Sequence, residues 1–194
     1  METSSIYDSL AALLVYPGGD YHQRVTRAAQ ALAAVDGEAA LLLAHFAEKI
    51  RNFSVEALQE LFIQTFDMNP NRSLEMGWHL FGENYDRGTF LVKMRQQLRR
   101  FGVAESAELP DHVSHVLAVL GRMPADEAEE FGVACVFPAL EKMRAGFGDK
   151  KEENVFKDVL DALAGLLRGR YGDALLESAA GAPALRVLQR SELR

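Results

Sequence analysis

Apolar residues recur at helical spacing along most of the chain, most clearly in residues 54–67. Five positions in this run follow the spacing i, i+3, i+4, i+7, i+8: Leu58, Leu61, Phe62, Thr65 and Phe66. This spacing places all five on one face of an α-helix. Ser54 is a good N-cap residue, and Glu56 puts negative charge in the first turn, where the helix dipole favours it. The run therefore predicts an amphipathic helix with one buried face.

A second apolar seam follows the helix-breaking residues 69–71. Its members are Leu91, Met94, Leu98 and Phe101. Gly102 comes next, at the position where glycine commonly ends a helix. A basic strip lies mostly on the other faces of this helix and consists of Lys93, Arg95, Arg99 and Arg100. A further helix is predicted at residues 110–121, with Pro110 at its first position.

The same periodicity predicts the remaining helices. They cover residues 3–15, 20–35, 38–51, 125–135, 137–145 and 152–171. The apolar group on residues 38–51 consists of Leu41, Leu42, His45 and Phe46. Because Pro138 follows closely, we place a break between two helices at Val136-Phe137. No segment shows the period-2 alternation of a strand. We predict an all-α chain of one domain, residues 1–194, with roughly eight to ten helices, and a short helix and frayed tail at 172–194.

Composition narrows the classes of function. A net charge of −7 opposes any function that depends on general affinity for nucleic acid. No apolar run approaches the roughly 18 residues that span a bilayer, and no export signal precedes the first basic residue, Arg24. The single cysteine, Cys135, excludes a disulfide within the chain and a thiolate-rich metal site. We expect a cytoplasmic protein that binds no nucleic acid and does not insert into membranes.

Candidate catalytic groups are few. His112 and His115 stand at i, i+3, with His79 earlier in the chain, and such histidines can bind metal. The chain has no HExxH motif and no carboxylate–histidine pattern of the di-iron type. We expect a protein that is not an enzyme and holds no metal; a helical metal-dependent protein that uses these histidines is the alternative. Cys135 lies among apolar residues, which predicts a buried, unreactive thiol.

The connector before the second seam is rich in aromatic side chains. They are Trp78, Phe81, Tyr85 and Phe90. Such residues either staple helices together or line a groove for an incoming apolar segment. Gly82 and Gly88 flank Arg87 without forming a Walker A loop, so we interpret them as residues of tight turns. The basic strip is either solvated or attracts an acidic or amphipathic partner.

Several short motifs in this region carry a family resemblance. They are Thr65-Phe66-Asp67, Ser73-Leu74, His79-Leu80-Phe81-Gly82, Asp86-Arg87-Gly88 and Glu108-Leu109-Pro110-Asp111-His112, with Leu13-Leu14-Val15-Tyr16-Pro17 nearer the start. In order and spacing this set resembles the NarJ-type nitrate reductase assembly chaperones, within the TorD/DmsD group of redox-enzyme maturation proteins. The motifs extend over residues 6–120.

The resemblance implies a function as well as a fold. It implies a TorD/NarJ-like, all-helical cytoplasmic chaperone, a monomer or weak homodimer, without catalysis or a cofactor of its own. Such a chaperone binds the catalytic subunit of a molybdoenzyme through that subunit's N-terminal segment. It keeps this client competent to receive the molybdenum bis-guanine dinucleotide cofactor and delays assembly with partner subunits. Nitrate reductase is the expected client, and another oxidoreductase of the DMSO-reductase family is the alternative.

The resemblance also places the client-binding surface around the connector, with the basic strip beside it. The expected contact residues are Phe62, Phe66, Asp67, Trp78, His79, Phe81, Arg87, Phe90, Asp111 and His112. The polar members would anchor polar groups of the peptide, and the aromatic members its apolar side chains. The residues expected to hold the fold are Tyr16, Pro17, Gly82, Gly88 and Pro110.

Overall fold

Helices make up almost all regular structure in the computed structural model, which describes residues 2–148 and 154–177. The α-helices are α1 (Glu2–Ala11), α2 (Tyr21–Ala33), α3 (Gly37–Ile50), α4 (Val55–Phe62), α5 (Met76–Phe81), α6 (Tyr85–Arg100), α7 (Val113–Leu120), α8 (Ala125–Phe131), α9 (Phe137–Ala145) and α10 (Lys157–Glu177). Two π-helical segments, η1 (Ile63–Asp67) and η2 (Gly132–Val136), continue α4 and α8. The all-α prediction and the expected number of helices are confirmed over these residues.

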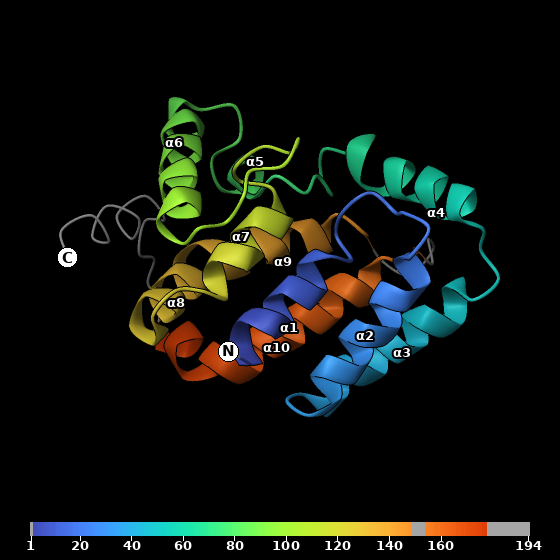
Figure 1. Ribbon diagram of the computed structural model, residues 1–194. Helices are drawn as coiled ribbons and strands as arrows, with labels where there is room; N and C mark the ends of the chain where they lie inside the picture. Colours follow the sequence, from blue (N-terminus) through green and yellow to red (C-terminus); the bar gives the residue numbers. More distant parts are fainter. Residues whose placement is uncertain (1, 149–153, 178–194) are drawn as a thin grey trace.

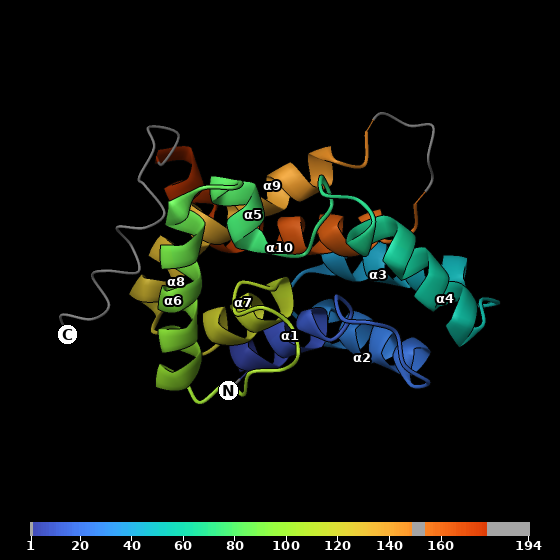
Figure 2. The ribbon, with the colours of Figure 1, turned by 90° about the horizontal axis from the view of Figure 1, so that it is seen from above.

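Helix α10 runs through the middle of the molecule and packs against α3 and α9 (Figures 1 and 2). Helices α2 and α3 form an antiparallel pair, and α1 packs between α2 and α7. In the view from above, α6 and α4 lie toward opposite ends of the molecule, with α5 beside α6 (Figure 2). No helix in residues 2–148 or 154–177 has the length and apolar character needed to cross a membrane.

A chain of aromatic rings extends from the core to the surface. Phe156, just before α10, packs on Phe46 of α3 at 5.6 Å between ring centroids and on Phe62 at the same distance. Phe66 lies 4.9 Å from Phe62, and Tyr16 meets Phe62 edge-to-face at 6.1 Å. Burial of each such ring contributes about 2 kcal/mol. Because Tyr16 remains 49% exposed, the chain of rings ends at the surface.

The amphipathic run at 54–67 forms α4 as predicted, including the Ser54 cap, and then widens into the π-helix η1. The Met68 amide donates to the carbonyl of Ile63, five residues back. The Thr65 hydroxyl donates to Leu61 at 2.6 Å and accepts from the Asn154 side chain at 2.6 Å. A π-turn inserts one residue into a helix and occurs often at functional sites.

The start of α7 differs from the prediction. Pro110 does not open the helix; it lies in the preceding turn, and His112 is the N-cap residue. The backbone on either side of His112 pairs in extended form with residues 74–76, as an isolated antiparallel bridge. This pairing takes up the backbone groups that an earlier helix start would have used.

The predicted break at Val136-Phe137 is also wrong. The chain passes from α8 through η2 into α9 without interruption, and the Phe137 amide donates to the carbonyl of Gly132. Pro138 has no amide to donate to Ala134, and the wider π-turn just before it accommodates that loss. By contrast, Gly102 ends α6 as predicted: its φ is +63°, and the Val103 amide donates to Leu98 at 2.8 Å.

Three helix boundaries and the buried face of one helix differ from the prediction. Helix α1 ends at Ala11 rather than at residue 15, and α10 begins at Lys157 rather than at 152. Helix α10 continues past residue 171 to Glu177, with a kink at Tyr171 (φ −122°). In α3 the buried residues are Ala39, Leu43, Phe46 and Ile50, whereas Leu41 is 71% exposed. Three consecutive leucines fit either face, so spacing alone did not select the correct one. The tail predicted beyond Glu177 lies outside the described residues.

Candidate functional site

Two motif segments far apart in the chain are joined side by side. The Met76 amide donates to the carbonyl of Asp111 at 2.9 Å, and the Val113 amide donates to that of Leu74 at 2.8 Å. The Asp111 carboxylate also accepts from the Gly77 amide at 3.0 Å. This carboxylate therefore satisfies a free amide at the start of α5, as a capping residue would.

Asp111 is fully buried and lies beneath the surface. Burial raises the pKa of its carboxyl group, and Arg87, with its Nε 3.9 Å from Oδ2, counteracts part of that rise. A Cβ at Gly77 would lie 2.6 Å from Oδ2, so only glycine allows this approach. Asp111 thus contacts both the start of α5 and Arg87 from the interior of the protein.

Arg87 and Trp78 form one wall of a cleft above Asp111. The Arg87 guanidinium lies 5.7 Å from the centre of the Trp78 ring, within range of a cation–π interaction. The Trp78 indole N–H donates to the carbonyl of Pro70 at 2.8 Å, which fixes the ring against the loop before α5.

We call this hollow the motif cleft; its volume is about 650 Å³. It is lined by Tyr16, Phe62, Phe66, Asp67, Pro70, Ser73, Leu74, Glu75, Trp78, Arg87, Glu108 and His112. One part of the lining is aromatic and consists of Tyr16, Phe62 and Phe66 from the chain of aromatic rings. Another part is acidic, with Asp67, Glu75 and Glu108.

The acidic part of the cleft has no matching cations. No ion pair joins Asp67, Glu75 or Glu108 to a basic residue within the part of the chain that the structure describes. Burial raises the pKa of the Asp67 carboxyl, and the nearby Glu75 carboxylate raises it further. Glu75 accepts from the Ser73 hydroxyl.

His112 contributes a neutral group to the cleft. Burial lowers its pKa to about 4, despite the opposing effect of Glu75 and with a further lowering from His115. Its Nδ1 lies 2.8 Å from the Ser114 hydroxyl and 3.3 Å from the Ser114 amide, whose hydrogen it accepts at the start of α7. His112 is thus both a cap and part of the wall.

The structure brings six of the ten expected contact residues to the motif cleft. They are Phe62, Phe66, Asp67, Trp78, Arg87 and His112. The other four lie behind it: Asp111, Phe90, His79 and Phe81. Phe90 is fully buried, and its ring lies 5.4 Å from that of Phe81. His79 is also buried, with Nε2 2.8 Å from the Ser73 carbonyl oxygen, and burial lowers its pKa.

The motif cleft also has lining residues that were not among the expected contact residues. Tyr16, which was expected to hold the fold, packs on Phe62 and also lines the cleft. Glu75 and Glu108 were not singled out, although Glu75 directly follows Ser73-Leu74 and Glu108 opens a motif. Gly82 does sit in a tight turn, with φ +62°. Gly88 does not, because it lies within α6.

The basic strip is largely paired and does not line the cleft. Arg95 bonds Glu105 at 2.9 Å, and Arg100 forms a bidentate pair with Glu127 at 2.6 and 2.9 Å. These pairs tie α6 to the following loop and to α8. The turn at Pro17 is tied to α4, because its carbonyl accepts from the Gln59 side chain at 2.8 Å.

The histidines give the metal alternative no geometric support. His115, in α7, contacts the loop before that helix: its Nε2 accepts from the Ser106 amide at 3.1 Å, and its Nδ1 lies 2.9 Å from the Leu109 carbonyl oxygen. Within residues 2–148 and 154–177, no three His, Cys, Asp or Glu side chains converge as a metal site would require. Cys135 is buried, and burial raises its pKa, which keeps the thiol protonated and unreactive.

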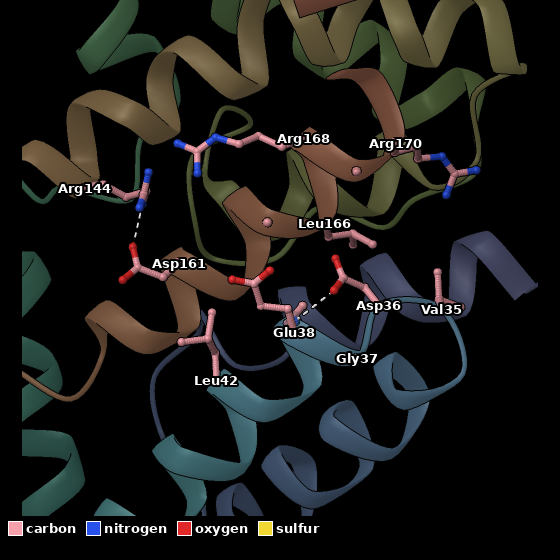
Figure 3. Close-up of a pocket in the computed structure, with 13 residues that line it drawn as sticks. Val35, Asp36, Gly37, Glu38, Leu42, Arg144, Asp161, Leu166, Arg168 and Arg170 are labelled. Atoms are coloured by element: carbon pink, nitrogen blue, oxygen red, sulfur yellow. Dashed lines mark hydrogen bonds and ion pairs between the residues drawn. The ribbon is translucent and has the colours of Figure 1, made fainter. Parts of the chain in front are cut away.

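A larger hollow of about 1140 Å³ lies between the start of α3 and α10 (Figure 3). Several of its charged groups already have partners within the protein. Arg144 bonds Asp161 at 2.6 Å, and Asp36 accepts from the Ala39 amide at 3.0 Å as the N-cap of α3 (Figure 3). None of the motif residues reaches it, so the motif cleft is the stronger candidate.

The sequence matches a known protein family. Residues 29–167 match the family described as nitrate reductase delta subunit, which is more than half of the chain. The chain belongs to that family. The matched residues include every lining residue of the motif cleft except Tyr16, and extend past the last motif into α10.

Individual relatives of the delta subunit family are also similar to this chain. The nitrate reductase molybdenum cofactor assembly chaperone NarJ of Escherichia coli (strain K12) is 30% identical over 140 residues. The aligned region covers 70% of this chain and 59% of that relative. NarJ of Escherichia coli O157:H7 shows the same identity and coverage. The chain therefore spans less than two thirds of the length of these curated relatives.

Proposed function

We propose that this protein is an assembly chaperone for nitrate reductase, which binds the catalytic subunit and supports insertion of its molybdenum cofactor. Membership of the delta subunit family and the similarity to a relative named as such a chaperone support this function. The observation that carries it is the motif cleft, where residues from motifs up to 96 positions apart line one hollow, from Tyr16 to His112.

The finer step is the mode of binding. In this proposal the N-terminal segment of the catalytic subunit lays the apolar face of a helix along the aromatic part of the cleft. Exposed apolar side chains adjoin the cleft in sequence or line it: Tyr16, Met68 and Leu109 are 49%, 73% and 45% exposed. Exposed apolar groups rimmed by polar ones are typical of interaction sites. Binding there would hold the client open and delay its assembly with partner subunits.

This function needs moderate affinity rather than catalysis. A chaperone must release its client, and a micromolar complex, at about −8 kcal/mol, allows release. In this proposal the protein is not an enzyme, works in the cytoplasm as a monomer or weak homodimer and has no cofactor of its own. Its client receives the molybdenum bis-guanine dinucleotide cofactor. A client from elsewhere in the DMSO-reductase family would use the cleft in the same way.

The test compares binding with folding. Calorimetric titration with synthetic N-terminal peptides of molybdoenzyme catalytic subunits should show one-to-one binding to the peptide from nitrate reductase. Arg87→Glu should weaken that binding by at least tenfold, while Arg51→Glu, on an exposed arginine outside the cleft, should leave it unchanged. If Arg87→Glu lowers the melting temperature as severely as the affinity, Arg87 holds the fold instead. If no peptide binds, the proposed mode is wrong.

A further inference from the structure

Several carboxylates of the protein lie against a cation, but within residues 2–148 and 154–177 those that line the motif cleft do not. Elsewhere, acidic residues commonly lie against a cation: Asp8 pairs with Arg122 at 2.7 Å and Asp158 with Lys49 at 3.2 Å. In the cleft, the Glu75 carboxylate raises the pKa of Asp67, and neither residue has a basic partner within the described part of the chain. Asp67 is exposed and Glu75 is half-buried in the cleft lining, so a cation placed between the two carboxylates would relieve their repulsion.

The two basic side chains of the cleft do not fill that role. Arg87 belongs to the cleft wall, but its Nε lies 3.9 Å from Oδ2 of the buried Asp111 and its guanidinium lies over the Trp78 ring. His112 is neutral near pH 7, because its pKa lies at about 4, and its Nδ1 is used in capping α7. The acidic part of the cleft therefore keeps a negative charge that a bound segment can neutralise.

We propose that the segment bound in the motif cleft places a lysine or arginine side chain between Asp67 and Glu75, next to an apolar side chain on the aromatic wall. This inference rests on the proposed function and specifies the chemistry of the partner. Phe66 and Asp67 are neighbours in η1, so one bound helix can meet both with residues three or four apart on one face. A charge pair that is partly shielded from water is stronger than one on an open surface.

Charge removal on the protein tests the pairing. Wild type, Asp67→Asn/Glu75→Gln and the control Glu38→Gln are titrated calorimetrically with the nitrate reductase N-terminal peptide at low and high salt. Glu38 is exposed on α3, outside the cleft. The double variant should bind about tenfold more weakly and lose most of the salt dependence, and the control should match wild type. Melting temperatures confirm that all three chains fold.

Charge changes on the peptide complete the test. Replacing each lysine or arginine of the peptide in turn by glutamine should reproduce the loss at one position. A peptide with glutamate at that position should bind the Asp67→Lys variant more tightly than it binds the wild-type protein. If the peptide binds tightly and none of these changes alters its affinity, the cationic contact is wrong and the chaperone function is still supported. Absence of binding by every chain and peptide would overturn both.

Discussion

Asp111 illustrates how a motif residue can act without touching a ligand. It is fully buried, accepts from the Gly77 amide at 3.0 Å, and lies under Arg87. The sequence indicated that Asp111 and Arg87 belong to one region, and the structure shows which of them faces the cleft. Burial could not be predicted for Asp111, because a carboxylate is usually exposed unless a distant amide is brought to it.

Gly77 should tolerate no side chain. We expect Gly77→Ala to lower the free energy of unfolding by about 1–3 kcal/mol, because the new methyl group would overlap the Asp111 carboxylate and approach Phe90 at 3.1 Å. Gly165→Ala is the matched control, since its Cβ would meet open space within α10. Chemical denaturation of both variants measures the difference. Equal stability of Gly77→Ala and wild type would contradict the close packing.

His112 should make the fold sensitive to acid. Its pKa is lowered from 6.5 to about 4 in the folded chain, so the unfolded chain binds a proton first as the pH falls through this window. Stability should be full above pH 6.5 and fall toward pH 4, by up to roughly 3 kcal/mol from this group.

His112→Asn separates this effect from capping. Asparagine can still cap α7 but does not titrate, so the loss of stability between pH 6.5 and 4 should become shallower. A smaller acid loss remains, because burial also lowers the pKa of His79. Denaturation curves at several pH values measure the slopes. Identical slopes for variant and wild type would exclude His112 as their source.

At the scale of elements, spacing and caps predicted most of the helices. The Ser54 start of α4 and the Gly102 end of α6 follow from local chemistry and are confirmed. The start of α7 depends on pairing between Asp111 and Met76, which are distant in sequence. Within η1, Thr65 accepts a hydrogen bond from Asn154, which is also distant in sequence. Neither leaves a periodic signal, so neither could be predicted.

Two glycines of the connector should respond in opposite ways. Gly82 has φ +62° and ψ −145°, a conformation that other residues rarely adopt, so Gly82→Ala should cost about 1 kcal/mol or more. Gly88 lies inside α6 with open space around its Cβ position, so Gly88→Ala should raise stability by roughly 0.5–1 kcal/mol. Thermal melting of the two variants gives the sign. Destabilisation by both would mean that Gly88 also serves a turn.

At the scale of the whole molecule, the fold converts separated motifs into one surface. The turn at Tyr16, the end of η1, helix α5 and the loop before α7 all reach the motif cleft. The aromatic spacing indicated Phe62 and Phe66 as a pair, but the placement of Tyr16 beside them depends on tertiary packing. The acidic part of the cleft likewise includes Glu75 and Glu108, which lie far apart in sequence and come together only in the folded chain.

The most direct test uses Trp78, the single tryptophan of the chain, which lies in the cleft wall. Its fluorescence is titrated with the N-terminal peptide of a nitrate reductase catalytic subunit and with a scrambled peptide. We predict that only the nitrate reductase peptide changes the fluorescence, with saturation at one-to-one stoichiometry and an affinity near micromolar. The Tyr16→Ala variant should bind this peptide more weakly. Calorimetric binding of that peptide without any change at Trp78, and with full affinity in Tyr16→Ala, would show that the client binds elsewhere.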